Sequence, residues 1–133
     1  MSEEKKIKVV LLEPGKLARA AEIDASLAGM QRVVGGLIEP YYPFEEQVCI
    51  VCNEEGKING MRPNRSVKSE DGVMIDFIFG PAFICDCRGE NLASLSDEQI
   101  DRYGRMFRYP EHLARVNDTL LGIPYRPQPA QER

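Results

Sequence analysis

The chain has 133 residues, of which 43% are hydrophobic and 29% charged, and its formal net charge is -4. This length and composition predict one compact domain whose core needs neither disulfides nor a metal. The acidic balance argues against a dedicated nucleic-acid-binding protein, which would carry a basic surplus for phosphate contacts. No apolar run reaches the roughly eighteen residues of a membrane span, and the charged start Met1 to Lys6 lacks the apolar centre of a signal peptide. We therefore expect a cytoplasmic protein with no membrane association.

The N-terminal part of the chain predicts a strand, a helix and another strand. Residues 7–12 form an apolar run that a Pro-Gly pair ends, and residues 16–23 predict a connector or a second extended segment. Apolar residues recur at helical spacing within residues 27–34, where Asp24 or Ser26 can cap the helix and a glycine pair can end it. A strand is expected over residues 37–42, with its proline at an edge or a bulge.

Four cysteines occur as Cys49-x-x-Cys52 and Cys85-x-Cys87, a spacing that at first suggests a zinc site. A structural zinc site holds its Cys-x-x-Cys pair in a tight turn, whereas residues 48–53 are rich in β-branched side chains and predict a strand. Because positions three apart on a strand face opposite sides, Cys49 and Cys52 should diverge. We expect free thiols packed in the core, a reducing compartment, no bound metal and no cofactor.

The rest of the chain predicts three more strands and a well-capped helix. Residues 57–61 follow an Asn-Glu-Glu-Gly turn and predict a hairpin arm, residues 66–72 predict an exposed loop, and two apolar runs at 73–79 and 82–87 predict the last strands. Ser96-Asp97-Glu98-Gln99 is a capping box that opens a helix through Phe107.

These elements predict an α+β fold. We expect a single domain at residues 1–107, with a mostly antiparallel sheet of about five strands and two to three helices packed on one face. Residues 108–133 are expected to form a short helix from Pro110 through Asn117, followed by a proline-rich tail.

Arg62, Asn64 and Arg65 are the first candidates for a ligand-binding site. Pro63 fixes its own φ and favours extended geometry before it, which predicts a rigid loop whose guanidinium groups bind phosphate or carboxylate. The alternative is that Asn64 caps a turn while the arginines pair with acidic residues at 54–55 or 70–71.

Residues before this loop could extend the site. Asn53, Lys57 and Asn59 would add polar groups, and Tyr41, Tyr42 and Phe44 could stack on a nucleotide base. Partial burial at a sheet edge is the simpler interpretation of the aromatic residues, and we favour it.

No catalytic constellation is present in the sequence. The single histidine, His112, lies in the proline-rich C-terminal region, and the adjacent acids Glu54 and Glu55 are typical of a solvated turn. Gly35-Gly36 follows a helix and lacks the Lys-Ser/Thr pair of a phosphate loop. We therefore expect no catalytic residues.

Four motifs stand out in combination. They are Glu13-Pro14-Gly15-Lys16, Leu27-x-x-Met30-Gln31-x-x-Val34-Gly35-Gly36-x-Ile38-Glu39, Cys52-Asn53-Glu54-Glu55-Gly56-Lys57-x-x-Gly60-x-x-Pro63-Asn64-Arg65, and the segment from Phe79-Gly80 to Leu95-Ser96-Asp97-Glu98-Gln99. Together they resemble the domain-of-unknown-function family 3846 over Ile7 to Phe107. That family occurs in bacteria, plasmids and phages, so the resemblance implies a mobile-element or viral setting in a bacterial host cell, and it transfers no established activity.

Three function classes remain open from the sequence. The favoured class is a non-enzymatic protein that binds a small anionic ligand, such as a nucleotide-derived defence signal sequestered on behalf of a phage. The alternatives are an inhibitor or anti-defence factor that docks on a host protein, and a nucleotide-processing hydrolase that works through Glu, Asp and a metal. Because so small a domain has little surface with which to enclose a nucleotide-sized ligand, we also expect a homo-oligomer.

Overall fold

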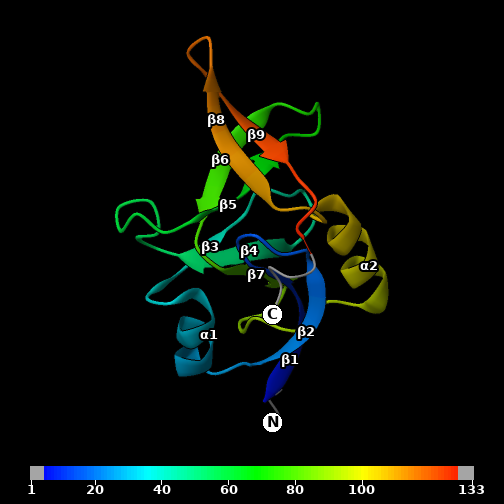
Figure 1. Ribbon diagram of the computed structural model, residues 1–133. Coiled ribbons are helices and arrows are strands. Elements are labelled where there is room, and N and C mark those ends of the chain that lie inside the picture. Colours follow the sequence, from blue (N-terminus) through cyan, green and yellow to red (C-terminus); the bar gives the residue numbers. More distant parts are fainter. Residues whose placement is uncertain (1–4, 129–133) are drawn as a thin grey trace.

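A computed structural model describes residues 5–128, in which a five-stranded antiparallel sheet forms the centre of the molecule (Figure 1). Every neighbouring pair in the sheet is antiparallel, so the predicted α+β class is confirmed. In spatial order the strands are β2 (Arg19–Asp24), β1 (Lys6–Leu12), β7 (Ala82–Asp86), β4 (Val48–Asn53) and β3 (Ile38–Tyr41).

The two helices cover opposite faces of this sheet. Helix α1 (Leu27–Val34) packs on the face that carries Val9 and Val51, and α2 (Asp97–Met106) packs on the face that carries Val10 and Ile50. The expectation that the helices share one face was therefore wrong. The central strands are apolar at consecutive positions, so both of their faces must be covered.

Local sequence signals place the helix ends where they were predicted. The Ser26 hydroxyl accepts a hydrogen bond from the Gly29 N–H at 3.0 Å, and α1 ends at Gly35, whose φ is 82°. Ser96 and Gln99 form the predicted capping box at the start of α2. These short-range contacts need no information from the rest of the fold, which is why the sequence is sufficient to find them.

Strand β4 has the predicted bounds, and its cysteines diverge as predicted. Cys49 is fully buried on the α1 side of the sheet, whereas Cys52 packs against the cluster on the α2 side. Among residues 5–128, all four cysteines are free thiols, and no group of three or more His, Cys, Asp or Glu side chains is arranged to hold a metal ion.

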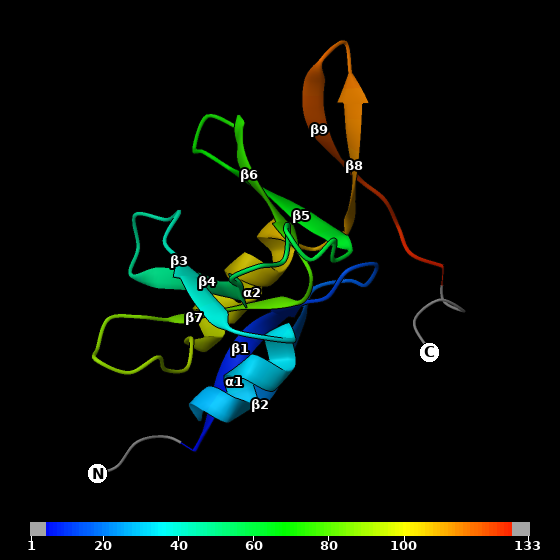
Figure 2. The same cartoon turned by 90° about the vertical axis from the view of Figure 1, so that its left-hand side faces the viewer.

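Two further hairpins project from the same end of the molecule (Figures 1 and 2). One joins β5 (Pro63–Lys68) to β6 (Met74–Phe79), and the other joins β8 (Glu111–Val116) to β9 (Thr119–Pro124). They touch where a Glu111 carboxylate oxygen accepts a hydrogen bond from the Ser66 backbone N–H at 3.0 Å. The second hairpin thus rests against the first.

Three local predictions were wrong. Residues 57–61 form a turn instead of a strand, because Gly60 adopts a positive φ of 67° and the Met61 N–H bonds back to the Gly56 carbonyl. The predicted loop at 66–72 begins inside β5, and the predicted helix from Pro110 is strand β8. The tail residues beyond 128 lie outside the described part of the chain. Neither helix within residues 5–128 has the length and apolar character that crossing a membrane requires.

Candidate functional site

Arg65 lies in the interior of the protein, with 1% of its surface exposed. Its Nε donates to the Phe107 carbonyl at 2.6 Å, Nη1 donates to the Glu13 carbonyl at 3.2 Å, and Nη2 donates to the Lys16 carbonyl at 2.6 Å. Further bonds to the Asn64 side chain and the Arg108 carbonyl engage all five guanidinium N–H groups. Burial lowers the pKa of Arg65 to about 10, which leaves it charged at neutral pH. No donor remains for an external anion.

Asn64 and Asn53 have similar structural roles. The Asn64 side-chain amide is buried and donates to the Leu12 and Gly80 carbonyls at 3.0 and 2.8 Å. The Asn53 amide donates to the Val34 carbonyl at 3.1 Å, while its oxygen accepts from the Glu55 N–H. Three residues predicted to face a ligand therefore connect strands, helix and turns instead.

The bonds of Arg65 hold the turn that follows β1 in place. They fix the carbonyls of Glu13 and Lys16 on either side of Gly15, whose φ is 79°. A side chain at Gly15 would lie 2.7 Å from Nη2 of Arg62, so the glycine allows that guanidinium to rest against the turn. Arg62 is exposed, unlike Arg65. Arg65 thus positions the wall against which Arg62 lies.

Arg62 lines a cleft of about 640 Å³ that we call the basic cleft. The cleft lies where the turn after β1, the start of β5, the start of β8 and the segment after β9 meet. Its lining residues are Pro14, Gly15, Lys16, Arg62, His112, Tyr125, Arg126 and Gln128.

The basic cleft carries three cationic side chains and no carboxylate among the described residues. Neither Lys16, Arg62 nor Arg126 forms an ion pair with any acidic side chain of residues 5–128. The nearby acid Glu13 bonds instead to Arg19 at 2.7 Å. Positive charge that the described residues leave uncompensated favours an anionic ligand at this place.

Two aromatic contacts shape the C-terminal wall of the cleft. The rings of His112 and Tyr125 are stacked, with centroids 4.0 Å apart and an angle of 12° between their planes. Arg126 lies 5.4 Å from the ring centre of Tyr109 and donates a hydrogen bond to its hydroxyl. The first contact joins β8 to the segment after β9, so flat rings border the cationic groups.

The other predicted site residues lie elsewhere. Tyr41, Asn53 and Lys57 line a second cleft of about 350 Å³, together with the acids Glu39, Glu54 and Asp76. Lys57 pairs with Asp76 at 2.7 Å, which compensates its charge. The second cleft therefore does not combine with Arg62 into one site.

The remaining candidates form no binding surface together. Tyr42 is 62% exposed, and Asn59 lies in the exposed turn after β4. Phe44, which was considered with the tyrosines for base stacking, packs on Tyr103 with ring centres 4.9 Å apart. Its role is to bury the face that α2 covers.

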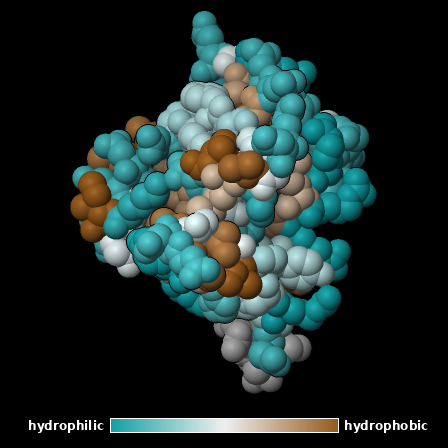
Figure 3. Space-filling view, turned by 90° about the horizontal axis from the view of Figure 1, so that it is seen from above, coloured by the Kyte–Doolittle hydropathy of each residue, from teal (hydrophilic) through white to brown (hydrophobic). Residues whose placement is uncertain are grey.

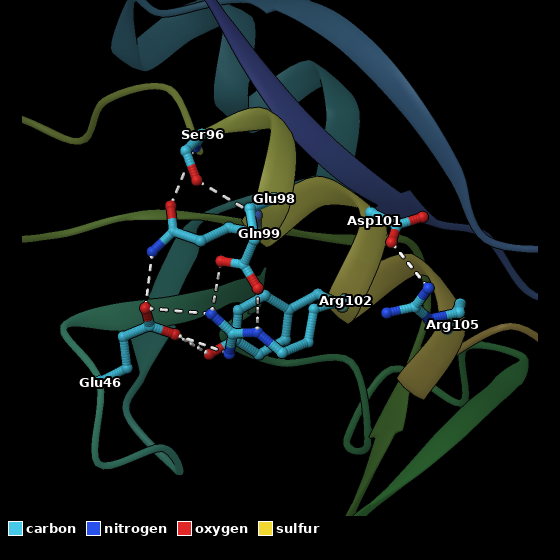
Figure 4. A network of polar contacts seen from close by, with 8 residues as sticks. Glu46, Ser96, Glu98, Gln99, Asp101, Arg102 and Arg105 are labelled. Carbon is cyan, nitrogen blue, oxygen red and sulfur yellow. Dashed lines mark hydrogen bonds and ion pairs between the residues drawn. The ribbon is translucent and has the colours of Figure 1, made fainter.

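A polar network attaches the loop before β4 to α2 (Figure 4). Glu46 accepts hydrogen bonds from the Tyr103 hydroxyl at 2.6 Å, the Gln99 amide at 2.8 Å and the Arg102 guanidinium at 3.0 Å. The bonds from Arg102, then Tyr103 and Gln99, lower the pKa of Glu46 to about 2. Because each donor is a side chain of the helix, we interpret this network as structural.

The sequence predicted Arg62 as a site residue but did not single out the other cationic and aromatic residues of the basic cleft. Lys16 appeared only inside a family motif, and His112, Tyr125 and Arg126 lie in a segment that was predicted to be a helix and a tail. One usable signal was present: two short runs rich in aliphatic residues flank Asn117-Asp118, a pair that favours a hairpin turn.

Some residues that line the basic cleft lie inside the segment matched by a known protein family, and others lie beyond it. The family model described as "Domain of unknown function (DUF3846)" matches residues 7–108, which include Lys16 and Arg62 but not His112 or Tyr125. No curated protein and no solved structure matches the chain. The match covers most of the 133 residues and confirms the resemblance seen in the motifs: the protein belongs to the DUF3846 family.

Proposed function

We propose that this protein binds a small anionic ligand of nucleotide type in the basic cleft. The observation that carries the proposal is the convergence of Lys16, Arg62 and Arg126 on one cleft with no carboxylate among its described lining residues. Guanidinium and ammonium groups in such a position donate charge-assisted hydrogen bonds, which are the strong contacts of phosphate recognition.

The size and shape of the cleft support a ligand larger than a bare phosphate. Its volume of about 640 Å³ lies within the range of roughly 300–1,000 Å³ that is typical of small-molecule sites. The stacked rings of His112 and Tyr125 offer a flat surface of the kind on which nucleotide bases pack. A phosphate-bearing ligand with an aromatic base matches both features.

The contacts of His112 favour binding over catalysis. Its ring stacks on the ring of Tyr125, and among the described residues it has no hydrogen bond to a carboxylate or to a nucleophile. General acid–base catalysis requires a proton donor or acceptor that is held in a fixed orientation. A nucleophilic mechanism requires a nucleophile within hydrogen-bond distance of a base. We therefore propose sequestration of an intact ligand. Within this proposal, the protein acts in the cytoplasm of a bacterial host, on behalf of a phage or mobile element, as a homo-oligomer.

Calorimetric titration tests the proposal. The probes are inorganic phosphate, ADP-ribose and cyclic nucleotides, added to the parent chain, to Arg62→Ala and to Arg105→Ala. Arg105 pairs with Asp101 on α2 and does not line the cleft, so its variant is the matched control. Losing one charge-assisted contact of roughly 1.5–3 kcal/mol should weaken binding by about ten- to a hundredfold in Arg62→Ala only.

Two results would contradict the proposal. One is that no probe binds, and the other is that Arg62→Ala binds as tightly as the parent chain. Recovery of the ligand after heat denaturation separates sequestration from hydrolysis, since an unchanged ligand supports sequestration and a cleaved one supports the enzyme alternative.

A further inference from the structure

One face of the β8–β9 hairpin carries exposed aliphatic side chains, and we call it the aliphatic face. The strand register places on it the opposed pairs His112–Ile123, Ala114–Leu121 and Val116–Thr119. Its three large aliphatic side chains, those of Val116, Leu121 and Ile123, are between 41% and 46% exposed. None of the three belongs to either core cluster, so the fold of the described residues leaves them uncovered.

The opposite face of the hairpin is the one that rests against β5. On that face Glu111 accepts the hydrogen bond from the Ser66 N–H, and a side chain at Gly122 would lie 3.0 Å from the Ser66 Cβ. Arg115 and Leu120 oppose each other in the register and belong to this second face too. In Figure 2 the β5–β6 hairpin lies on one side of the β8–β9 hairpin, and their tips stand apart. The aliphatic face therefore points away from β5.

The aliphatic face begins at the wall of the basic cleft. His112 belongs to both, since it lines the cleft and its ring stacks on that of Tyr125. Ile123 lies directly opposite His112, and the Cβ atoms of such a pair are about 5 Å apart. At about 3.4 Å per residue, the face extends roughly 14 Å from His112 to Val116. A ligand in the cleft thus has an apolar surface beside it.

The cleft and the aliphatic face differ in chemistry. Among the described residues, the cationic groups of Lys16, Arg62 and Arg126 have no acidic partner. The stacked rings of His112 and Tyr125 adjoin both regions, and no residue of the aliphatic face other than His112 is ionisable. A complementary ligand has an anionic group, a flat ring and an apolar group.

The size of the aliphatic face suits an apolar group of a small molecule. A protein partner would bury roughly 800 Å² on each side, which is far more than three half-exposed aliphatic side chains provide. Figure 3, viewed onto the end from which the hairpins project, shows apolar side chains in separate small groups among polar ones. The surface there is not one large apolar area of the kind that a protein partner covers.

We propose that the ligand of the basic cleft carries an aliphatic group at the end remote from its phosphate, and that this group lies on the aliphatic face. The inference rests on the proposed function and names the ligand class, an amphiphilic nucleotide. Its phosphate meets the cationic side chains, its base packs on the stacked rings, and its aliphatic chain covers Ile123 and Leu121. Removing that chain from water adds a stabilisation that a plain nucleotide lacks.

Calorimetric titration with two probes tests this inference. The probes are adenosine monophosphate and its derivative with a hexyl group on the exocyclic amine, which differ only in the aliphatic chain. The parent chain should bind the hexyl derivative at least about tenfold more tightly, since each methylene group removed from water favours binding. Arg62→Ala should weaken the binding of both probes by the same factor.

Two leucine variants locate the hexyl group. Leu121→Gln should lose most of the gain from the hexyl group and leave the affinity for adenosine monophosphate unchanged. Leu120→Gln is the matched control and should keep the gain, because Leu120 is 43% exposed but lies on the opposite face of the same strand.

Three outcomes would overturn the inference while the proposed function stands. They are equal affinities of the two probes for the parent chain, a gain that Leu120→Gln loses as fully as Leu121→Gln, and sedimentation of the parent chain, but not of Leu121→Gln, with phosphatidylglycerol vesicles. The last result would make a membrane surface the occupant of the aliphatic face. If neither probe binds the parent chain, the proposed function falls together with this inference.

Discussion

Arg65 and Arg62 show how burial decides the role of an arginine. Both belong to the same short polar motif, yet one is enclosed by five acceptors and the other is exposed at a cleft. The buried guanidinium donates to four backbone carbonyls, of which those of Glu13 and Arg108 also accept a backbone N–H. The carbonyls of Phe107 and Lys16 depend on Arg65, so the buried charge stabilises the fold only while these bonds form. A sequence motif gives the residue types but not this difference.

The two arginines should therefore respond differently to substitution by lysine. Lysine carries its N–H donors on a single nitrogen, whereas Arg65 reaches the Phe107 carbonyl from Nε and the Lys16 carbonyl from Nη2, so Arg65→Lys should leave at least one of these two carbonyls without a partner. At about 1–3 kcal/mol for each unsatisfied group, the free energy of unfolding should fall by about 1–3 kcal/mol. Urea unfolding of the variant and the parent chain measures this loss of stability. Arg62→Lys, the exposed control, should change stability by less than about 0.5 kcal/mol, and an equal loss in both variants would refute the structural role of Arg65.

Glu46 predicts a specific sensitivity to acid. Its pKa is about 2 in the folded chain, below its ordinary value of 4.5, so its contribution to stability is complete above pH 4.5. That contribution is lost as the pH falls from about 4.5 towards 2. Because about a third of the side chain is exposed, solvent screening reduces the effect to about 1 kcal/mol.

Acid unfolding of Glu46→Gln tests this prediction. The variant should be less stable than the parent chain at pH 7, and the difference should shrink below pH 4. The neighbouring residue Glu45 is exposed and forms no ion pair within residues 5–128, so Glu45→Gln should match the parent chain throughout. A constant difference between Glu46→Gln and the parent at every pH would contradict the assignment.

At the scale of elements, local signals were sufficient where the element is defined by its own residues. Helices α1 and α2 have their predicted caps, and β4 has its predicted bounds. Strand β5 could not be found in this way, because Asn64, Arg65 and Ser66 are polar residues that are buried only after distant carbonyl and carboxylate groups pair with them. Its burial is a property of the tertiary fold.

The β8–β9 hairpin was missed because Pro110 suggested the first turn of a helix. Asn117 and Asp118 instead adopt positive φ angles of 50° and 67°, which makes a two-residue turn that matches the twist of the strands. Proline is equally compatible with the residue before a strand, so it does not distinguish the two structures. The turn pair was the more informative signal.

The turn provides a prediction for the hairpin. Asp118→Gly should stabilise it by about 0.5 kcal/mol, because glycine adopts a positive φ without the steric cost of a side chain. Asp118→Val should destabilise the hairpin by about 1–2 kcal/mol, because the branched side chain clashes with the backbone at a positive φ. Hydrogen exchange of the β8 amides reports both changes. If valine and glycine gave the same protection, the proposed turn geometry would be incorrect.

At the scale of the whole molecule, the basic cleft exists only after folding. Residues near positions 15, 62, 112 and 126 come together because Arg65 fixes the turn after β1 and Glu111 holds β8 beside β5. The sequence predicted an anion site at Arg62, but the structure places the other predicted site residues in the core, in the second cleft or on separate exposed segments. Proximity along the chain was a poor guide to proximity in space.

Amide chemical-shift mapping with ADP-ribose and with inorganic phosphate tests the anion site most directly. The amide chemical shifts should change most at residues that line the basic cleft, both within the family match at residues 7–108 and beyond it. These residues are Gly15, Lys16, Arg62, His112 and Tyr125. Arg62→Ala should reduce these changes while leaving the rest of the spectrum intact. Changes confined to Lys57 and Ile58 in the second cleft, or no changes with either probe, would contradict it.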